Sequence, residues 1–412
     1  MILLSHSGKQ HSYQVANALN DLGHLHRFYT SSYLASPILQ RYFTCKGNTY
    51  WTRRFIDGLP GNKVDANWRF EVPEVILRAI QGKSPAVQRA VYARDVKFDG
   101  YVARILRKSD TLARKQITHY WGFQGSCHQS LQAARQLGIT TWCELATAHV
   151  VAAKRILGEE SSLHPEWAHT IDNLTFPIGY ETRLIEEPLL ADKVVAASSF
   201  TITTLQEVGV ADQQILYLPL GCDIDHVPYT PQIESKITQR PLRLLYAGTI
   251  TQRKGIKYLL EAMKILNNRD IELHLIGGIQ GNDSPLQGYK NHFHYHPPVS
   301  QSELFKLYGT YDALVLPTVF EGFGLVIVEA MAAGLPVITT PHSIGPELIN
   351  DDMNGYIVPI RNVDALANAI EKLRNKTDEA YLQMRLNARE AALKYSWEAY
   401  RERLKRVLEE QL

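Results

Sequence analysis

Two glutamates eight positions apart, Glu321 and Glu329, enclose the run Gly322, Phe323 and Gly324. The spacing predicts one carboxylate in a loop and the other about two turns later, with both able to face one cleft. The glycines allow backbone N–H groups close to a ligand, and a helix N-terminus adds partial positive charge. An isolated pair could be a solvated acid and a buried polar group. The Gly-Phe-Gly run and the apolar AMAAGLPVI after it favour a site for an extended, anionic or hydroxyl-rich ligand.

A second set of polar residues lies near predicted strand ends. Arg253 and Lys254 stand where a helix starts, and cations oppose the helix dipole there, so an anionic ligand explains them better than a solvated basic pair. His149 follows the strand TTWCEL, although a single histidine is often structural. Gly8, Lys9 and Gln10 follow the first strand, as an ordinary strand–helix turn or as a ligand-facing loop.

Short apolar strands alternate with amphipathic helices along the chain, which is typical of parallel α/β sheets with right-handed crossovers. The pattern pauses over a proline-rich, polar stretch near 219–242 and then restarts. We therefore expect an α/β fold with two doubly wound, Rossmann-like domains facing a central cleft: 1–220, a linker 221–242, and 243–395. The amphipathic helix 396–412 either finishes the second domain or packs back onto the first, and we adopt the second arrangement as the expectation.

These motifs resemble those of retaining, nucleotide-sugar-dependent glycosyltransferases of the GT-B fold, family 4 type. Glu321 to Glu329 is similar to the family's E-x7-E element. The segments with comparable resemblance are LLYAGTITQRKGIKYLLEA (244–262), SELFKLYGTYDALVLPT (302–318), PHSIGPELINDDMNGYIVP (341–359), SGKQHSYQVANALNDLGH near the start, and ADKVVAASSFTITTLQEVGV with LPLGCDID before the linker. The resemblance is dense over 244–359 and loose over 35–115.

The resemblance implies roles for the donor-side residues. Glu329 would bind the ribose hydroxyls, and Glu321 the donor-sugar hydroxyls, with help from the N–H groups of Gly322, Phe323 and Gly324. Lys254, with Arg253, would neutralise the leaving diphosphate. The family usually has Arg directly after the loop glycine, whereas here Thr249 follows Gly248, which leaves open whether Arg253 supplies the second charge.

For the remaining residues the implied roles are less specific. His149 would contact the donor sugar, and Val299 lies where the family tends to hold the nucleobase. Gly8, Lys9 and Gln10 would form a loop facing donor or acceptor.

The resemblance implies transfer of a hexose-type sugar from a UDP- or GDP-sugar to an acceptor hydroxyl, with retention, in glycan, polysaccharide or glycolipid assembly. The acceptor would be a glycan, a lipid-linked molecule or a small molecule. Alternatives are a catalytically silent partner subunit, or a sugar phosphorylase or nucleotide-sugar epimerase of the same architecture. The sequence contains no P-loop, no G-x-G-x-x-G after a strand and no H-E-x-x-H. We therefore expect no cofactor, no metal and no NAD.

The net charge of +2 argues against a nucleic-acid partner. It conceals an asymmetry, because residues 1–190 carry net +6, residues 191–412 carry net −4, and the aromatic-rich stretch 41–115 carries net +9. That stretch is either a scattered solvated face or a surface for anionic lipid headgroups.

Four cysteines outside any C-x-x-C pair, with no signal peptide or spanning segment, favour a cytoplasmic enzyme that can work at the inner membrane face.

Overall fold

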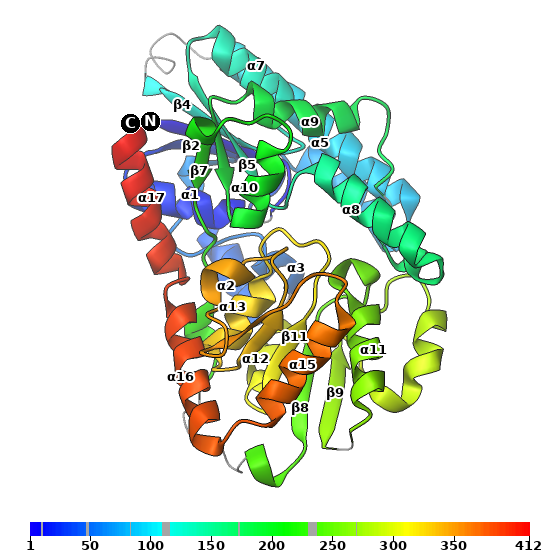
Figure 1. Cartoon of the computed structure of the whole chain (residues 1–412). Helices are drawn as coiled ribbons and strands as arrows, with labels where there is room; N and C mark the ends of the chain where they lie inside the picture. Colours follow the sequence, from blue (N-terminus) through cyan, green and yellow to red (C-terminus); the bar gives the residue numbers. More distant parts are fainter. Residues whose placement is uncertain are drawn as a thin grey trace.

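The computed structural model describes residues 1–9, 11–46, 49–82, 84–108, 116–171, 174–229, 237–268 and 270–412. Figure 1 shows two α/β halves stacked end to end, with both chain termini at the same corner of the N-terminal half. Each half is built on one sheet whose strand pairs are all parallel. The predicted fold class, two doubly wound sheets, is confirmed.

The N-terminal half has seven strands in the order β3-β2-β1-β4-β5-β6-β7. Most of their apolar side chains are buried, as expected for parallel strands covered on both faces. The strands are β1 Ile2–His6, β2 Leu25–Thr30, β3 Val64–Ala66, β4 His119–Phe123, β5 Thr140–Leu145, β6 Lys193–Ala196 and β7 Ile215–Tyr217. The helices are α1 Ser12–Asp21, α2 Pro37–Cys45, α3 Thr49–Thr52, α4 Val72–Gln81, α5 Pro85–Lys108, α7 His128–Gln136, α8 Val150–Leu163, α9 Tyr180–Leu190 and α10 Ser199–Gln206.

The C-terminal half has six strands in the order β10-β9-β8-β11-β12-β13. They are β8 Leu242–Ala247, β9 Ile271–Ile276, β10 His294–His296, β11 Ala313–Leu316, β12 Val337–Thr339 and β13 Gly355–Ile357. The helices are α11 Ile256–Leu266, α12 Gln301–Tyr308, α13 Leu325–Ala332, α14 Gly345–Leu348, α15 Val363–Arg374 and α16 Asp378–Leu393. Leu242 already belongs to β8, so the strand begins at the last residue of the predicted linker.

The last helix, α17 (Trp397–Gln411), returns to the N-terminal half, where it forms the red column beside the first sheet in Figure 1. Its buried face, Tyr400, Leu404 and Leu408, shares a core cluster with residues of β1 and α1. The two chain crossings between the halves run side by side, because Cys222 pairs with Ser396 in an isolated parallel bridge. The apolar stripe of this helix therefore covers the first domain rather than the second.

The predicted alternation of strands and helices is present in both halves. The helix after TTWCEL begins at Val150, because His149 takes the N-cap position in an extended conformation and its ring accepts the Val151 N–H. No helix in the described ranges has the length and apolar character needed to cross a bilayer.

The strand orders determine where a ligand can bind. In the first sheet, β1 lies between β2 and β4, so the strand order reverses direction at β1. The second sheet repeats this at β8, with β9 on one side and β11 on the other. Open parallel sheets bind ligands beyond the carboxyl ends of strands at such switch points. The loops after β1, β8 and β11 carry Lys9, the Arg253–Lys254 pair and Glu321, all of which were selected from the sequence.

Candidate active site

The loop between β11 and α13 carries Glu321 and the glycine run. Gly324 has φ +89° and is the N-cap of α13, a conformation that favours glycine. Gly322 has a different requirement. A Cβ there would lie 2.4 Å from Thr147 Cα and 2.8 Å from Ala146 O, both in the loop after β5. The glycine therefore lets the two halves approach until their backbones touch.

The loop after β8 presents the two predicted cations to Glu321. Arg253 Nη1 lies 3.2 Å and Lys254 Nζ 3.7 Å from Glu321 Oε2. Burial lowers the pKa of the Lys254 ammonium, and the carboxylate of Glu321 opposes that shift. Two cations and a carboxylate thus converge beside the N-terminus of α13.

Two glycines make room for this cationic pair. Gly255 has φ +71°, and a Cβ there would lie 1.9 Å from Pro317 O. At Gly248, φ +132°, a Cβ would lie 2.9 Å from Lys254 Nζ. Because glycine has no Cβ, Gly248 makes space for the Lys254 ammonium. The next residue, Thr249, stands where the family usually has Arg, and its carbonyl accepts a hydrogen bond from Tyr246 Oη at 2.8 Å.

The N-terminal half anchors the same loop. Thr170 Oγ1 accepts the Gln252 N–H at 3.0 Å, and Gln252 Nε2 donates to Glu160 Oε1 at 2.7 Å. Glu160 is fully buried and also accepts from Tyr258 Oη (2.7 Å) and Arg361 Nε (2.7 Å). These long-range contacts couple the position of Lys254 to that of α8.

Glu329 lies on α13, 6% exposed, and its carboxylate is held by α12. Gln301 Nε2 donates to Oε1 (2.8 Å) and Tyr308 Oη to Oε2 (3.2 Å). Burial raises the pKa of the Glu329 carboxyl, and the two hydrogen bonds oppose the rise. Neither Glu329 nor Val299, 37% exposed just before α12, lines the two cavities described next.

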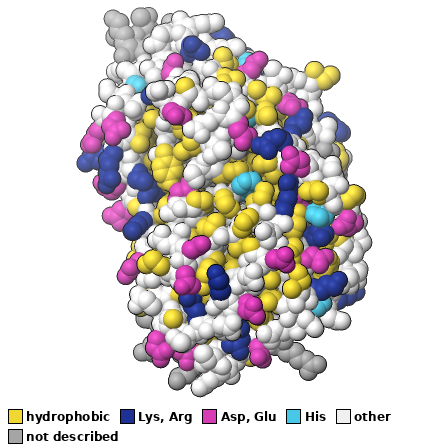
Figure 2. Space-filling view, in the orientation of Figure 1, with side chains coloured by type: hydrophobic (Ala, Val, Ile, Leu, Met, Phe, Trp, Pro, Cys, Tyr) yellow, Lys and Arg dark blue, Asp and Glu magenta, His cyan; other side chains and the backbone are white. Residues whose placement is uncertain are grey.

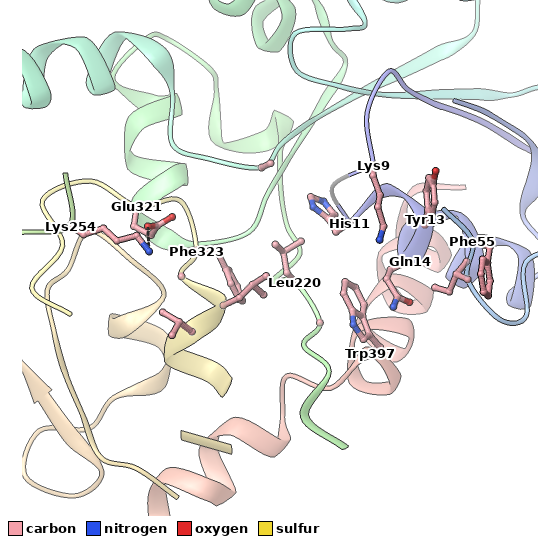
Figure 3. Close-up of a pocket in the computed structure, with 16 residues that line it drawn as sticks. Lys9, His11, Tyr13, Gln14, Phe55, Leu220, Lys254, Glu321, Phe323 and Trp397 are labelled. Atoms are coloured by element: carbon pink, nitrogen blue, oxygen red, sulfur yellow. Dashed lines mark ion pairs between the residues drawn. The ribbon is translucent and has the colours of Figure 1, made fainter. Parts of the chain in front are cut away.

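Two adjoining cavities occupy the region between the sheets. The larger, about 620 Å³, has walls from both halves, and the smaller measures about 420 Å³. Glu321 and Ala146 line both. Figure 3 shows Lys254, Glu321 and Phe323 on one wall, facing Lys9, His11, Tyr13 and Phe55 on the other, with Trp397 below. The larger cavity is lined by Lys9, His11, Tyr13, Gln14, Phe55, Ile56, Ala146, Leu220, Gly221, Lys254, Glu321, Phe323, Gly324, Leu325, Val326 and Trp397.

Of the remaining predicted residues, some line the larger cavity and others do not. Lys9 lines the larger cavity and Gly8 precedes it in the same loop, whereas Gln10 lies outside the described residues. His149 is completely buried and lines neither cavity. The side chain assigned to the donor sugar caps α8 in this structure.

Sequence reasoning missed a histidine that does reach the cavity. His11 Nε2 is hydrogen-bonded to Glu144 Oε1, and Trp121 Nε1 donates to Glu144 Oε2 at 3.0 Å. The His11 ring also meets Phe123 edge-on, with centroids 5.4 Å apart. Its only sequence signal is its place in G-K-Q-H directly after β1. Trp397 and Phe55 carried no signal that could place them here.

The described residues hold no group of three or more His, Cys, Asp or Glu that could bind a metal ion. The arrangement suits an anion at the Arg253–Lys254 pair and hydroxyl groups at Glu321, with an aromatic wall opposite.

Similarities to known proteins agree with this geometry. Over its full length the chain superposes on sucrose-phosphate synthase from Thermosynechococcus elongatus (TM-score 0.63, 18% identity, 100% of this chain and 98% of that one). It superposes similarly on HepE of Anabaena, solved with UDP and glucose (TM-score 0.61, 14% identity, 99% of both chains). The protein thus has the GT-B fold. Residues 232–391, about two fifths of the chain, match the family model for glycosyl transferases group 1.

Curated relatives match over part of their length. An uncharacterised glycosyltransferase of Methanocaldococcus jannaschii is 31% identical over 168 residues, 38% of this chain and 41% of that protein. The D-inositol 3-phosphate glycosyltransferase of Paenarthrobacter aurescens is 28% identical over 278 residues, 62% of this chain and 63% of that protein. The chain thus spans about two fifths to three fifths of the length of these two relatives.

Proposed function

We propose that the protein is a retaining glycosyltransferase that moves a hexose-type sugar from a nucleoside diphosphate sugar to an acceptor hydroxyl. The observation that carries this proposal is the convergence of Arg253 and Lys254 on Glu321 beside the N-terminus of α13. Such a cluster stabilises a diphosphate as it leaves while holding sugar hydroxyls beside it. Structures of HepE contain UDP and UDP-glucose, which supports a UDP-sugar as the first donor to test.

In the proposed reaction, the bond between the anomeric carbon and the diphosphate oxygen breaks. The acceptor oxygen attacks the same face and forms the new glycosidic bond, and its proton passes to the departing diphosphate. The protein positions the partners and stabilises charge, so no metal or separate base is required. Glu329 binds the ribose from its position on α13. His11, held by Glu144, donates or accepts a hydrogen bond at a substrate hydroxyl in the cavity.

The close contact of Gly322 with Thr147 supports a reaction in a closed cleft. Ser198 Oγ, at the start of α10, donates to Gly322 O at 2.6 Å, and the Ser199 N–H donates to Glu347. These bonds join the two halves around the glycine loop. Closure excludes water, which suppresses hydrolysis of the donor.

We also propose that this cytoplasmic enzyme contacts an anionic membrane through α4. Val72, Ile76 and Ile80 recur at four-residue spacing on this helix and are 44%, 55% and 75% exposed. An exposed apolar stripe within a stretch of net charge +9 suits an interfacial helix. Positive and negative side chains are interspersed on the face in Figure 2, so no single-sign patch is visible from that side.

The test of the enzymatic proposal begins with calorimetry against UDP, GDP and ADP. Donor hydrolysis without acceptor then identifies the sugar, and product analysis with candidate acceptors measures transfer and anomeric configuration. A product formed with inorganic phosphate alone would identify a phosphorylase, and an isomerised nucleotide sugar an epimerase. Absence of any nucleoside diphosphate binding would favour the silent partner subunit.

The test of the membrane contact through α4 is vesicle binding. The protein should bind vesicles with anionic lipid more tightly than neutral vesicles, and this binding should fall in the double variant Ile76→Ser/Ile80→Ser.

A further inference from the structure

The N-terminal wall of the larger cavity is left for the acceptor once the donor is assigned to the opposite wall. Its residues come from the loop after β1, from α1, from the segment before β3 and from the start of α17: Lys9, His11, Tyr13, Gln14, Phe55, Ile56 and Trp397. Aromatic rings dominate this wall, as in Figure 3. Flat sugar and polyol faces pack well on such rings, but the wall also contains an ammonium group.

Lys9 is half-buried, and its Nζ lies 5.9 Å from the centroid of the Tyr13 ring. Within the described residues no carboxylate forms an ion pair with it. Desolvation, together with the charges of Arg53 and Arg54, lowers the pKa of Lys9 to about 8. Lys9 therefore stands in a region of positive potential without a counter-ion from the described protein.

The described charged residues near Lys9 do not supply a counter-ion to its ammonium group. Arg54 is ion-paired with Glu71, which Ser31 also holds at 3.0 Å. Arg53 is exposed, and no described carboxylate pairs with it. The charge of Arg53 therefore adds to the positive potential at Lys9.

The acids near the cavity are already engaged. Glu321 is the acidic residue among the described lining residues, and Arg253 and Lys254 hold it on the opposite wall. Glu144 accepts hydrogen bonds from His11 and Trp121. No other acid lines the cavity in the described part of the chain, so an anionic ligand on this wall meets Lys9 without competition from a neighbouring carboxylate.

We propose that the acceptor carries a phosphate group, which forms an ion pair with Lys9 and is attracted by Arg53, while its hydroxyl-bearing part lies against the aromatic wall. This inference names the acceptor class of the proposed function and rests on it. A phosphate monoester carries between one and two negative charges at neutral pH, so it interacts with the positive potential at Lys9 more strongly than the single charge of a carboxylate. The potential also raises the local concentration of anionic acceptors.

The test compares ligand pairs that differ only in the phosphate: glucose 6-phosphate with glucose, and myo-inositol 3-phosphate with myo-inositol. Calorimetry measures their affinities for the full chain saturated with the nucleoside diphosphate that binds best. Vesicles with and without phosphatidylinositol form a separate arm. A preference shown for a soluble phosphate identifies a sugar- or polyol-phosphate acceptor, and a preference confined to vesicles identifies a lipid headgroup.

Variants separate this site from the donor site. In Lys9→Met the preference for the phosphorylated member should fall at least tenfold, and Lys9→Arg should restore most of it. Lys254→Met should lose nucleoside diphosphate affinity and keep the phosphate preference. Lys264→Met, on the exposed side of α11, is the matched control and should change neither.

Amine acylation followed by mass spectrometry gives a second readout, because a lysine with a lowered pKa reacts quickly at pH 8. Glucose 6-phosphate or inositol phosphate should protect Lys9 where the uncharged partner does not. Equal affinities within every pair, or a preference that survives in Lys9→Met, would overturn the inference while nucleoside diphosphate binding stands. If the wild-type protein binds no nucleoside diphosphate, the proposed function is overturned instead.

Discussion

Replacement of Gly322 by alanine tests whether the two halves must meet at the glycine loop. The new Cβ would lie 2.4 Å from Thr147 Cα, whereas ordinary contacts begin at 3.4 Å. One wall must therefore shift by about 1 Å before the contact becomes normal. Both neighbouring groups are backbone, so no flexible side chain can move aside.

A displacement of that size has a calculable effect. Overpacking of a close contact costs about 1–3 kcal/mol, which corresponds to about 5- to 150-fold in a rate or equilibrium constant. A misplacement of about 1 Å in an active site can by itself cost on the order of 10²-fold. We therefore expect kcat/KM for transfer in Gly322→Ala to fall by about 5- to 150-fold, with a smaller loss of nucleoside diphosphate affinity, because closure matters most for the reaction.

The assay is steady-state transfer from the nucleotide sugar, with calorimetry of the free nucleoside diphosphate and a thermal melt alongside. Gly158→Ala is the matched control, because it lies in α8 and a Cβ there meets nothing within 4 Å. The control should keep full activity and melt slightly higher, since alanine favours a helix over glycine. Wild-type kcat/KM in Gly322→Ala would show that the halves need not approach this closely.

Three further outcomes are expected. Lys254→Ala and Glu329→Ala should each lower transfer by on the order of 10²-fold or more, and full activity of purified, folded Lys254→Ala would refute the donor assignment. His11→Ala should lower kcat/KM by about 2- to 13-fold, as for one lost hydrogen bond, with donor hydrolysis showing whether donor or acceptor is affected; an unchanged rate would remove His11 from the reaction. Lys9→Met should raise the melting temperature at pH 7, because a folded-state pKa of about 8 against 10.5 makes the charged form destabilising below pH 8. This gain should shrink as pH rises from 8 to 10.5, and a constant gain would contradict the assignment.

The loop that carries Glu321 and the turn that carries Arg253 and Lys254 could be predicted from sequence because both are local. Glu321, Gly322, Phe323 and Gly324 occupy four consecutive positions directly before a helix, and Arg253 and Lys254 adjoin a glycine in a strand–helix turn. The alternation of strands and helices followed from the apolar period for the same reason. His149 shows the limit of this reasoning: its position after β5 was correct, but the fold uses its ring to cap α8 rather than to line a cavity.

The acceptor side depends on contacts between distant parts of the chain. His11 and Glu144 are 133 positions apart, and Trp397 reaches the cavity only because α17 returns along the first sheet. Lys9 owes its surroundings to the packing of residues 53 and 54. By itself the sequence determined two α/β units and the glycine-containing loop that carries Glu321. Tertiary structure decided which side chains face that loop, because burial, charge proximity and backbone approach depend on three-dimensional packing and leave no periodic signal along the chain.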